Sequence, residues 1–84
     1  MDELKIQVTE LLARVCGEDL ICSDDSLELL DSGLLDSLAM MTLLAELEDT
    51  LGVEIQPSQV SRECWRTPKL IVALVATTME LTDS

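Results

Sequence analysis

Ser37 is the residue whose surroundings point most directly to chemistry. It follows Asp36 and precedes Leu38, at the point where a loop becomes a predicted helix. The chain contains no histidine, so a Ser–His–Asp triad is excluded. Lys5 and Lys69 are the only lysines, and neither forms a local serine–lysine motif. The serine therefore has no base of its own to turn it into a nucleophile.

A hydroxyl at the start of a helix has two other uses. The unpaired amides and the dipole of the first turn favour a phosphate, so a phosphate attached to Ser37 would be well placed. Alternatively, Ser37 only caps the helix, as Asp36 can, because short polar side chains satisfy those amides. On the dipeptide alone, capping is the simpler interpretation.

Length and charge limit the other functions. The 84 residues predict one domain over residues 1–84, with a thin core and no deep catalytic pocket. The chain has 17 acidic and 5 basic residues, a net charge of −12. This charge would repel nucleic acid and anionic membranes and would steer basic partners toward the protein. The alternative is that the acidic residues only keep the protein soluble.

Cysteine usage and hydropathy bear on the location. Cys16, Cys22 and Cys64 form no CxxC pair, and no histidine can complete a zinc site. We expect reduced thiols, no metal site and a cytoplasmic protein. The acidic N-terminal segment does not resemble a signal peptide, and no apolar run approaches the ~20 residues of a membrane span.

Three helices must position Ser37. Apolar residues recur at helical spacing in residues 2–16, 37–51 and 68–80. Gly17 and Gly52 follow the first two segments as left-handed caps, and Thr67 precedes the third as its N-cap.

Two connections join these helices. The first, residues 17–36, is too apolar for a free linker, and we expect its apolar side chains to fold back onto the core: Leu20, Ile21, Leu27, Leu30, Leu34 and Leu35. In the second, residues 53–55 are an extended connector without a partner strand, and residues 58–64 form a short helix anchored by Trp65. The expected fold is all-α, a small four-helix bundle of three main helices plus one short helix.

The second helix has a core side and an outward side. Rotation by 100° per residue places on the core side Met40, Leu43, Leu44, Leu47 and Leu51. An apolar centre faces outward, made by Leu38, Met41 and Ala45, and an acidic rim borders it, made by Glu46, Glu48 and Asp49. Such a surface would suit a basic-rimmed groove on a partner enzyme. The alternative is that Leu38 is an ordinary exposed leucine.

Residues 32–55, SGLLDSLAMMTLLAELEDTLGVEI, resemble the carrier-protein superfamily. In that family an Asp-Ser-Leu motif opens the second helix, and the serine carries a 4′-phosphopantetheine arm. The resemblance implies a four-helix carrier fold, with Ser37 as the attachment residue and Asp36 as the motif residue that caps the helix.

A second stretch looks like the D-alanyl carrier proteins of teichoic acid modification. Those proteins carry a signature close to Pro-x-x-Phe-Asp-Arg-x-x-Trp-Asn-Thr-Pro-Asn. It is matched here at Pro57, Arg62, Trp65, Thr67 and Pro68, and the chain departs from it at Val60, Ser61, Arg66 and Lys69. In this family the region often meets partners, so Arg62 and Trp65 are candidate contacts, and the departures could alter which enzyme is recognised. The alternative for Trp65 is a large anchor that holds the short helix on the core.

The resemblance implies a non-catalytic carrier, a cytoplasmic monomeric phosphoprotein that does not enter the bilayer. A phosphopantetheinyl transferase would modify Ser37 from coenzyme A, and an adenylating amino-acid ligase would load the thiol of the arm with D-alanine as a thioester. A downstream acyltransferase, membrane-bound in the D-alanyl case, would take the cargo for teichoic acid D-alanylation in cell wall biogenesis. One alternative is a stand-alone acyl or aminoacyl/peptidyl carrier of a natural-product or fatty-acid pathway. Another is an unmodified helical interaction module.

Overall fold

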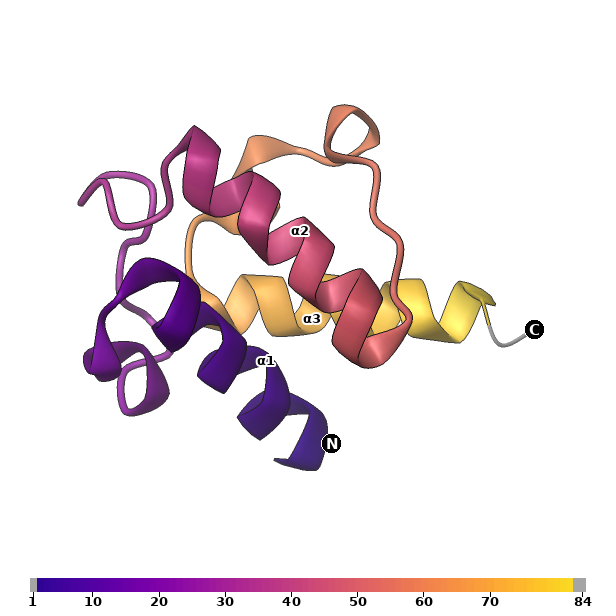
Figure 1. The fold of residues 1–84 in the computed structure, drawn as a ribbon, viewed down its shortest axis with the longest axis horizontal. Coiled ribbons are helices and arrows are strands. Elements are labelled where there is room, and N and C mark those ends of the chain that lie inside the picture. The colour runs from indigo at the N-terminus through magenta and orange to yellow at the C-terminus, as the bar shows by residue number, and fades with distance from the viewer. Residues whose placement is uncertain (1, 83–84) are drawn as a thin grey trace.

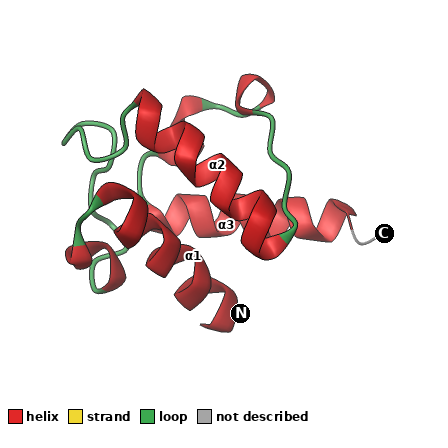
Figure 2. Ribbon diagram, in the orientation of Figure 1, coloured by secondary structure: helices red, strands yellow, loops and turns green. Residues whose placement is uncertain are grey.

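Helices joined by loops and turns make up the chain that the structure, a computed structural model, describes, which is residues 2–82 (Figure 2). The elements follow in the order α1 (Asp2–Cys16), η1 (Asp19–Cys22), α2 (Ser37–Leu51), η2 (Pro57–Gln59), η3 (Arg62–Trp65) and α3 (Pro68–Thr82), where η marks a 3-10 helix. No strand occurs within this range, which confirms the all-α fold class. None of these helices is long and apolar enough to cross a membrane.

The three α-helices share one core. α1 contacts both other helices, and α2 runs diagonally across α3 in the view of Figure 1. Each helix contributes apolar side chains that are fully or almost fully buried: Val8, Leu11 and Leu12 from α1, Leu43 and Leu47 from α2, and Ile71 and Val75 from α3. These positions follow the helical spacing of the sequence, because only one stripe of each helix faces the others.

The ends of the helices are formed by the residues that the sequence indicates. Gly17 and Gly52 both adopt a φ of 68°, a left-handed conformation that glycine takes without strain. The amide of Gly52 donates to the carbonyls of Leu47 and Glu48, close to the end of α2. At the start of α3, the Thr67 hydroxyl accepts a hydrogen bond from the Leu70 amide at 3.3 Å. The predicted caps are confirmed.

The long connection before α2 folds onto the core, as expected, but with one error and one omission. Ile21 and Leu35 are buried. Leu20 is 57% exposed, so its predicted burial is wrong: the one-turn helix η1 points Ile21 inward and leaves its neighbour outside. Leu29, which the sequence did not single out, is 0% exposed. Its amide donates to the Arg66 carbonyl at 2.7 Å, which ties this connection to the next one.

The second connection differs from prediction in one respect. Residues 53–55 form no strand, and Val53 and Ile55 are buried, as a connector that lies on the core requires. Residues 58–64 do not form one short helix, because Val60 and Ser61 separate the helical turns η2 and η3. The backbone of Ser61 is extended there, and its hydroxyl accepts from the Glu63 amide at 3.2 Å, which starts a new segment.

Candidate functional site

The first turn of α2 presents the Ser37 hydroxyl to solvent. Asp36 is the N-cap: its Oδ1 accepts from the Ala39 amide at 2.8 Å, and its carbonyl accepts from the Met40 amide at 2.8 Å. Ser37 is the next residue, the first of the helix, and it is exposed. Its hydroxyl makes no hydrogen bond to any residue in the range 2–82. Capping is therefore carried out by Asp36, and it does not explain Ser37.

A hollow of about 330 Å³ lies beside Ser37. It is bounded by three segments, the end of the first connection, the first turn of α2, and η3, which passes close to the start of α2 in Figure 1. The lining residues are Leu30, Gly33, Leu35, Asp36, Ser37, Met40, Arg62 and Trp65. The hollow combines an exposed hydroxyl, an apolar floor and one cationic side chain. We call it the serine hollow.

The sequence indicated only part of this hollow. Asp36, Ser37, Arg62 and Trp65 were candidates, but nothing in the spacing placed the last two beside Ser37. The apolar lining residues were expected only as core. Leu30, Leu35 and Met40 lie close to the Asp36–Ser37 motif in the chain, and this closeness is the one signal that could have identified them. The approach of η3 to the same place has no such signal, because it depends on the fold.

The two candidate residues of η3 differ in exposure. Arg62 is exposed. Trp65 is 2% exposed and belongs to the core, so it fits the role of an anchor for this segment. An indole so deeply buried leaves almost no surface for a partner. This burial favours the anchor role, and a partner contact through Trp65 stays a prediction.

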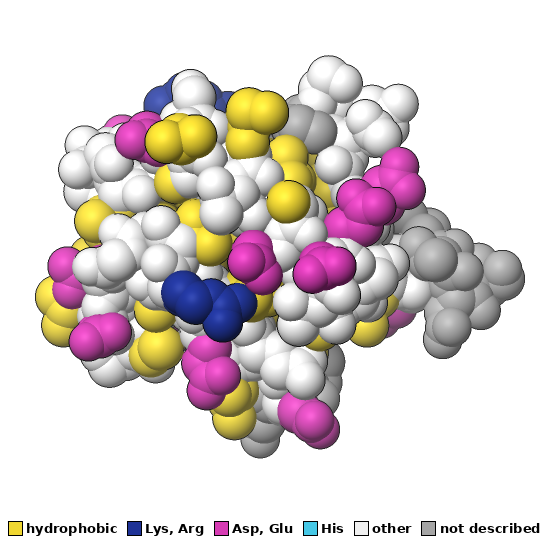
Figure 3. Space-filling model, viewed as in Figure 1, with side chains coloured by type: hydrophobic (Ala, Val, Ile, Leu, Met, Phe, Trp, Pro, Cys, Tyr) yellow, Lys and Arg dark blue, Asp and Glu magenta, His cyan; other side chains and the backbone are white. Residues whose placement is uncertain are grey.

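The apolar centre of the α2 face is exposed, as the helical spacing predicts. Leu38 is 76% exposed and Met41 is 70% exposed, the highest values among the exposed large hydrophobic side chains of the described chain. Ala45 is exposed one turn further on. Figure 3 shows hydrophobic side chains gathered over the first half of α2. Folding leaves these side chains in water.

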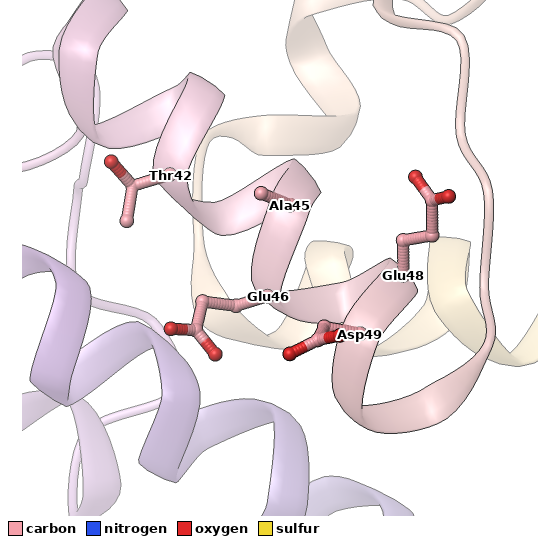
Figure 4. A pocket seen from close by; sticks show the side chains of 5 residues that line it. All are labelled: Thr42, Ala45, Glu46, Glu48 and Asp49. Atoms are coloured by element: carbon pink, nitrogen blue, oxygen red, sulfur yellow. The ribbon is translucent and has the colours of Figure 1, made fainter.

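The acidic rim lies on two sides of the same helix. Glu46, Glu48 and Asp49 line a shallow hollow of about 450 Å³ with Thr42 and Ala45. Figure 4 shows Glu46 and Asp49 pointing toward α1 and Glu48 pointing to the opposite side. Glu46 forms an ion pair with Arg14 of α1 at 3.3 Å, whereas the other two acids have no ion pair within residues 2–82.

The thiols lie in different surroundings. All three cysteines are free, and Cys22 is exposed. Burial raises the pKa of the Cys16 thiol, and the negative charge of Asp36 raises it further. The raised pKa favours the protonated form of this thiol at neutral pH.

Comparisons with known proteins bear on the whole of this region. The family described as "Phosphopantetheine attachment site" matches residues 7–75. The D-alanyl carrier protein 1 of Lactiplantibacillus plantarum is 43% identical over 75 residues, which cover 89% of this chain and 92% of that protein. The D-alanyl carrier protein 2 of the same organism is 42% identical over 76 residues, 90% and 94% of the two chains. The D-alanyl carrier protein of Bacillus cereus is 35% identical over 72 residues, 86% and 91% of the two chains.

Proposed function

We propose that this chain, which belongs to the family of phosphopantetheine attachment domains, carries D-alanine on a 4′-phosphopantetheine arm attached to Ser37 for the D-alanylation of teichoic acid. The family match confirms 4′-phosphopantetheine as the cofactor. The observation that carries the choice of Ser37 is its exposed, unbonded hydroxyl beside a residue that already caps the helix.

The serine hollow fits such a group. The phosphodiester would lie at the positive end of the α2 dipole and beside the cationic Arg62. The apolar floor, which includes Leu30 and Met40, would receive the chain that follows. When attached, the arm supplies a thiol that holds an acyl group as a thioester at the end of a flexible chain. Asp36 fixes the turn that presents the hydroxyl.

In this role the chain itself catalyses no step, and three enzymes act on it in turn. A phosphopantetheinyl transferase modifies Ser37, an adenylating ligase loads D-alanine, and a membrane-bound acyltransferase removes the cargo. The first step consumes coenzyme A and the second consumes ATP, so we expect the protein to be in the cytoplasm. Residues 1–84 act as one domain and as a monomer.

The outward face of α2 is the proposed docking surface for these enzymes. Leu38, Met41 and Ala45 offer an apolar centre next to the modified serine. Glu48 and Asp49 provide negative charge at its border, where charge mainly raises the association rate of a transient complex. Glu46 contributes less, because its carboxylate is already paired within the chain.

Three of the four departures from the D-alanyl carrier signature have structural roles within the chain, so they do not by themselves argue for another cargo. Ser61 caps η3, a role that the aspartate of the signature can also fill. Val60 replaces phenylalanine and still packs against the core. Arg66 lies within ion-pair distance of Glu28, at 3.4 Å, and of Glu63, at 2.5 Å. Only Lys69 of the four has no such role in the described chain.

Mass spectrometry of the intact protein tests the carrier assignment. After incubation with coenzyme A and a broad-specificity phosphopantetheinyl transferase, the wild-type chain should gain the mass of one arm. Ser32→Ala is the matched control for Ser37→Ala, since Ser32 is an exposed serine just before the motif. The Ser32→Ala variant should gain the mass as the wild type does. A wild-type chain that gains nothing would support an unmodified interaction module.

Loading then tests the cargo. The arm-bearing protein should accept D-alanine from a D-alanine-activating ligase faster than it accepts L-alanine or an acyl group from other loading enzymes. Preferential loading with a fatty acyl group or another amino acid would favour a carrier of a fatty-acid or natural-product pathway.

A further inference from the structure

We propose that Arg62 binds the phosphodiester on Ser37 and so holds the first part of the arm in the serine hollow. This inference rests on the proposed function, because it needs an arm at Ser37. It assigns Arg62 as a positioning residue for the arm, a role within the chain that differs from contact with a partner enzyme.

The argument begins with how the basic side chains are used. Three of the five are paired with acids of the chain: Lys5 with Asp25 at 3.5 Å, Arg14 with Glu46 at 3.3 Å, and Arg66 with Glu28 and Glu63. Within residues 2–82, Arg62 and Lys69 form no ion pair. Of these two, only Arg62 lines the hollow that contains Ser37.

The charge around Ser37 makes a local cation important. The protein has a net charge of −12, and a phosphodiester adds another negative charge directly after Asp36. Cations on distant parts of the molecule would contribute little, because salt screens exposed charges beyond about 8 Å at physiological ionic strength. A guanidinium also has the planar donor geometry that binds two phosphate oxygens at once.

The structure holds Arg62 at the right place while leaving its side chain free. The segment η3 is fixed at one end by the buried Trp65 and at the other by the capping hydroxyl of Ser61. Arg62 also borders a second hollow, of about 280 Å³, that includes Asp31 and Glu63. The side chain thus lies between the serine hollow and two carboxylates that it does not pair with. A phosphate on Ser37 would draw it toward the serine hollow.

The test compares Arg62→Gln with Lys69→Gln, which removes the same charge from the other unpaired basic residue. Both substitutions are at exposed positions, so both variants should fold, as far-UV circular dichroism will show. The arm is then attached to each variant until the intact mass shows complete conversion. In ³¹P NMR of the arm-bearing proteins, we expect the phosphodiester resonance to move in Arg62→Gln and to keep its wild-type position in Lys69→Gln. Arg62→Lys should restore the wild-type position in part.

Two further readouts report on the chain itself. The Nε–H signal of Arg62 should shift when the arm is attached, while that of Arg66 stays in place. Trp65 is the only tryptophan and lines the same hollow, so its fluorescence should change on attachment in the wild type and change less in Arg62→Gln. Lys69→Gln keeps the contact between Arg62 and the phosphodiester, whereas Arg62→Gln loses it. Attachment of the arm should therefore leave the folding equilibrium constant of Arg62→Gln roughly two- to fivefold lower relative to that of Lys69→Gln, which is the range of an exposed ion pair.

The outcomes separate the two proposals. If no arm can be attached to Ser37, the proposed function fails and this inference fails with it. If the arm is attached but the ³¹P resonance is the same in Arg62→Gln and Lys69→Gln, the inference is overturned and the proposed function stands. An unchanged Arg62 Nε–H signal on attachment would overturn it equally.

Discussion

Two leucines of the first connection should differ strongly in their response to the same substitution. Leu29 is 0% exposed and Leu20 is 57% exposed, although both lie in the connection between α1 and α2. Leu29→Ala should lower the free energy of unfolding by about 2–5 kcal/mol, because it removes buried methyl groups and leaves a cavity. Leu20→Ala should change it by less than about 0.5 kcal/mol, as is usual at exposed positions.

The larger loss matters for a chain of this size. At roughly 0.05–0.15 kcal/mol per residue, the 84-residue domain has a free energy of unfolding of about 4–13 kcal/mol. Leu29→Ala would therefore remove a large part of it. The effect should also reach the site, because the Leu29 carbonyl accepts from the Leu35 amide at 3.0 Å, shortly before the chain reaches Ser37.

Urea unfolding followed by circular dichroism measures both variants. With a slope of about 1 kcal/mol per M for a small domain, the midpoint of Leu29→Ala should fall by roughly 2 M or more, and that of Leu20→Ala should stay within about 0.5 M of wild type. Equal losses in the two variants would refute the assignment of Leu29 to the core and of Leu20 to the surface.

Three other results are expected. Asp36→Ala should cost the unmodified protein about 1 kcal/mol in urea unfolding, while Asp36→Asn, which can still cap, should cost little, and equal costs would argue against the cap. At pH 8, iodoacetamide should modify Cys16 more slowly than the exposed Cys22, because a raised pKa leaves less thiolate, and Asp36→Asn should speed the reaction of Cys16; a faster Cys16 would contradict this order. Glu48→Gln should slow loading by the ligase by roughly two- to tenfold at low salt and less at high salt, whereas Glu46→Gln, which loses a paired carboxylate, should have a smaller effect; the reverse order would contradict the proposed rim.

The helices were predictable because their signals are local. Helical spacing and the glycines after α1 and α2 gave both helices their observed bounds, and Thr67 marked the start of α3. These features depend on a few neighbouring residues, so no knowledge of the tertiary structure was needed.

Burial in the connections could not be predicted in the same way. An irregular segment has no period, so the apolar residues of residues 17–36 could not be sorted into inner and outer ones. For this reason Leu20 was wrongly expected on the core, and Leu29 was not singled out. Between residues 58 and 64 the hydrogen bond of the Ser61 hydroxyl to the Glu63 amide competes with a continuous helix, and helical spacing alone does not indicate this competition.

The same distinction between local signals and tertiary structure applies to the candidate site. Asp36 and Ser37 are adjacent in the chain, and a motif identifies them. The approach of Arg62 to Ser37 depends on how η3 crosses the start of α2, which only the tertiary structure provides. The absence of an ion pair at Arg62 within residues 2–82 is likewise a property of the fold, because the fold decides which acids pair with the other basic side chains.

Peptide-level tandem mass spectrometry tests the central claim most directly. The protein is treated with coenzyme A and the transferase and digested, and the modified residue is located, with Ser37→Ala treated in parallel. We expect one phosphopantetheine group on Ser37 in the wild type, none on Ser32, and no modification of a folded Ser37→Ala variant. A group located on another serine, or a mass gain that survives Ser37→Ala, would contradict the assignment.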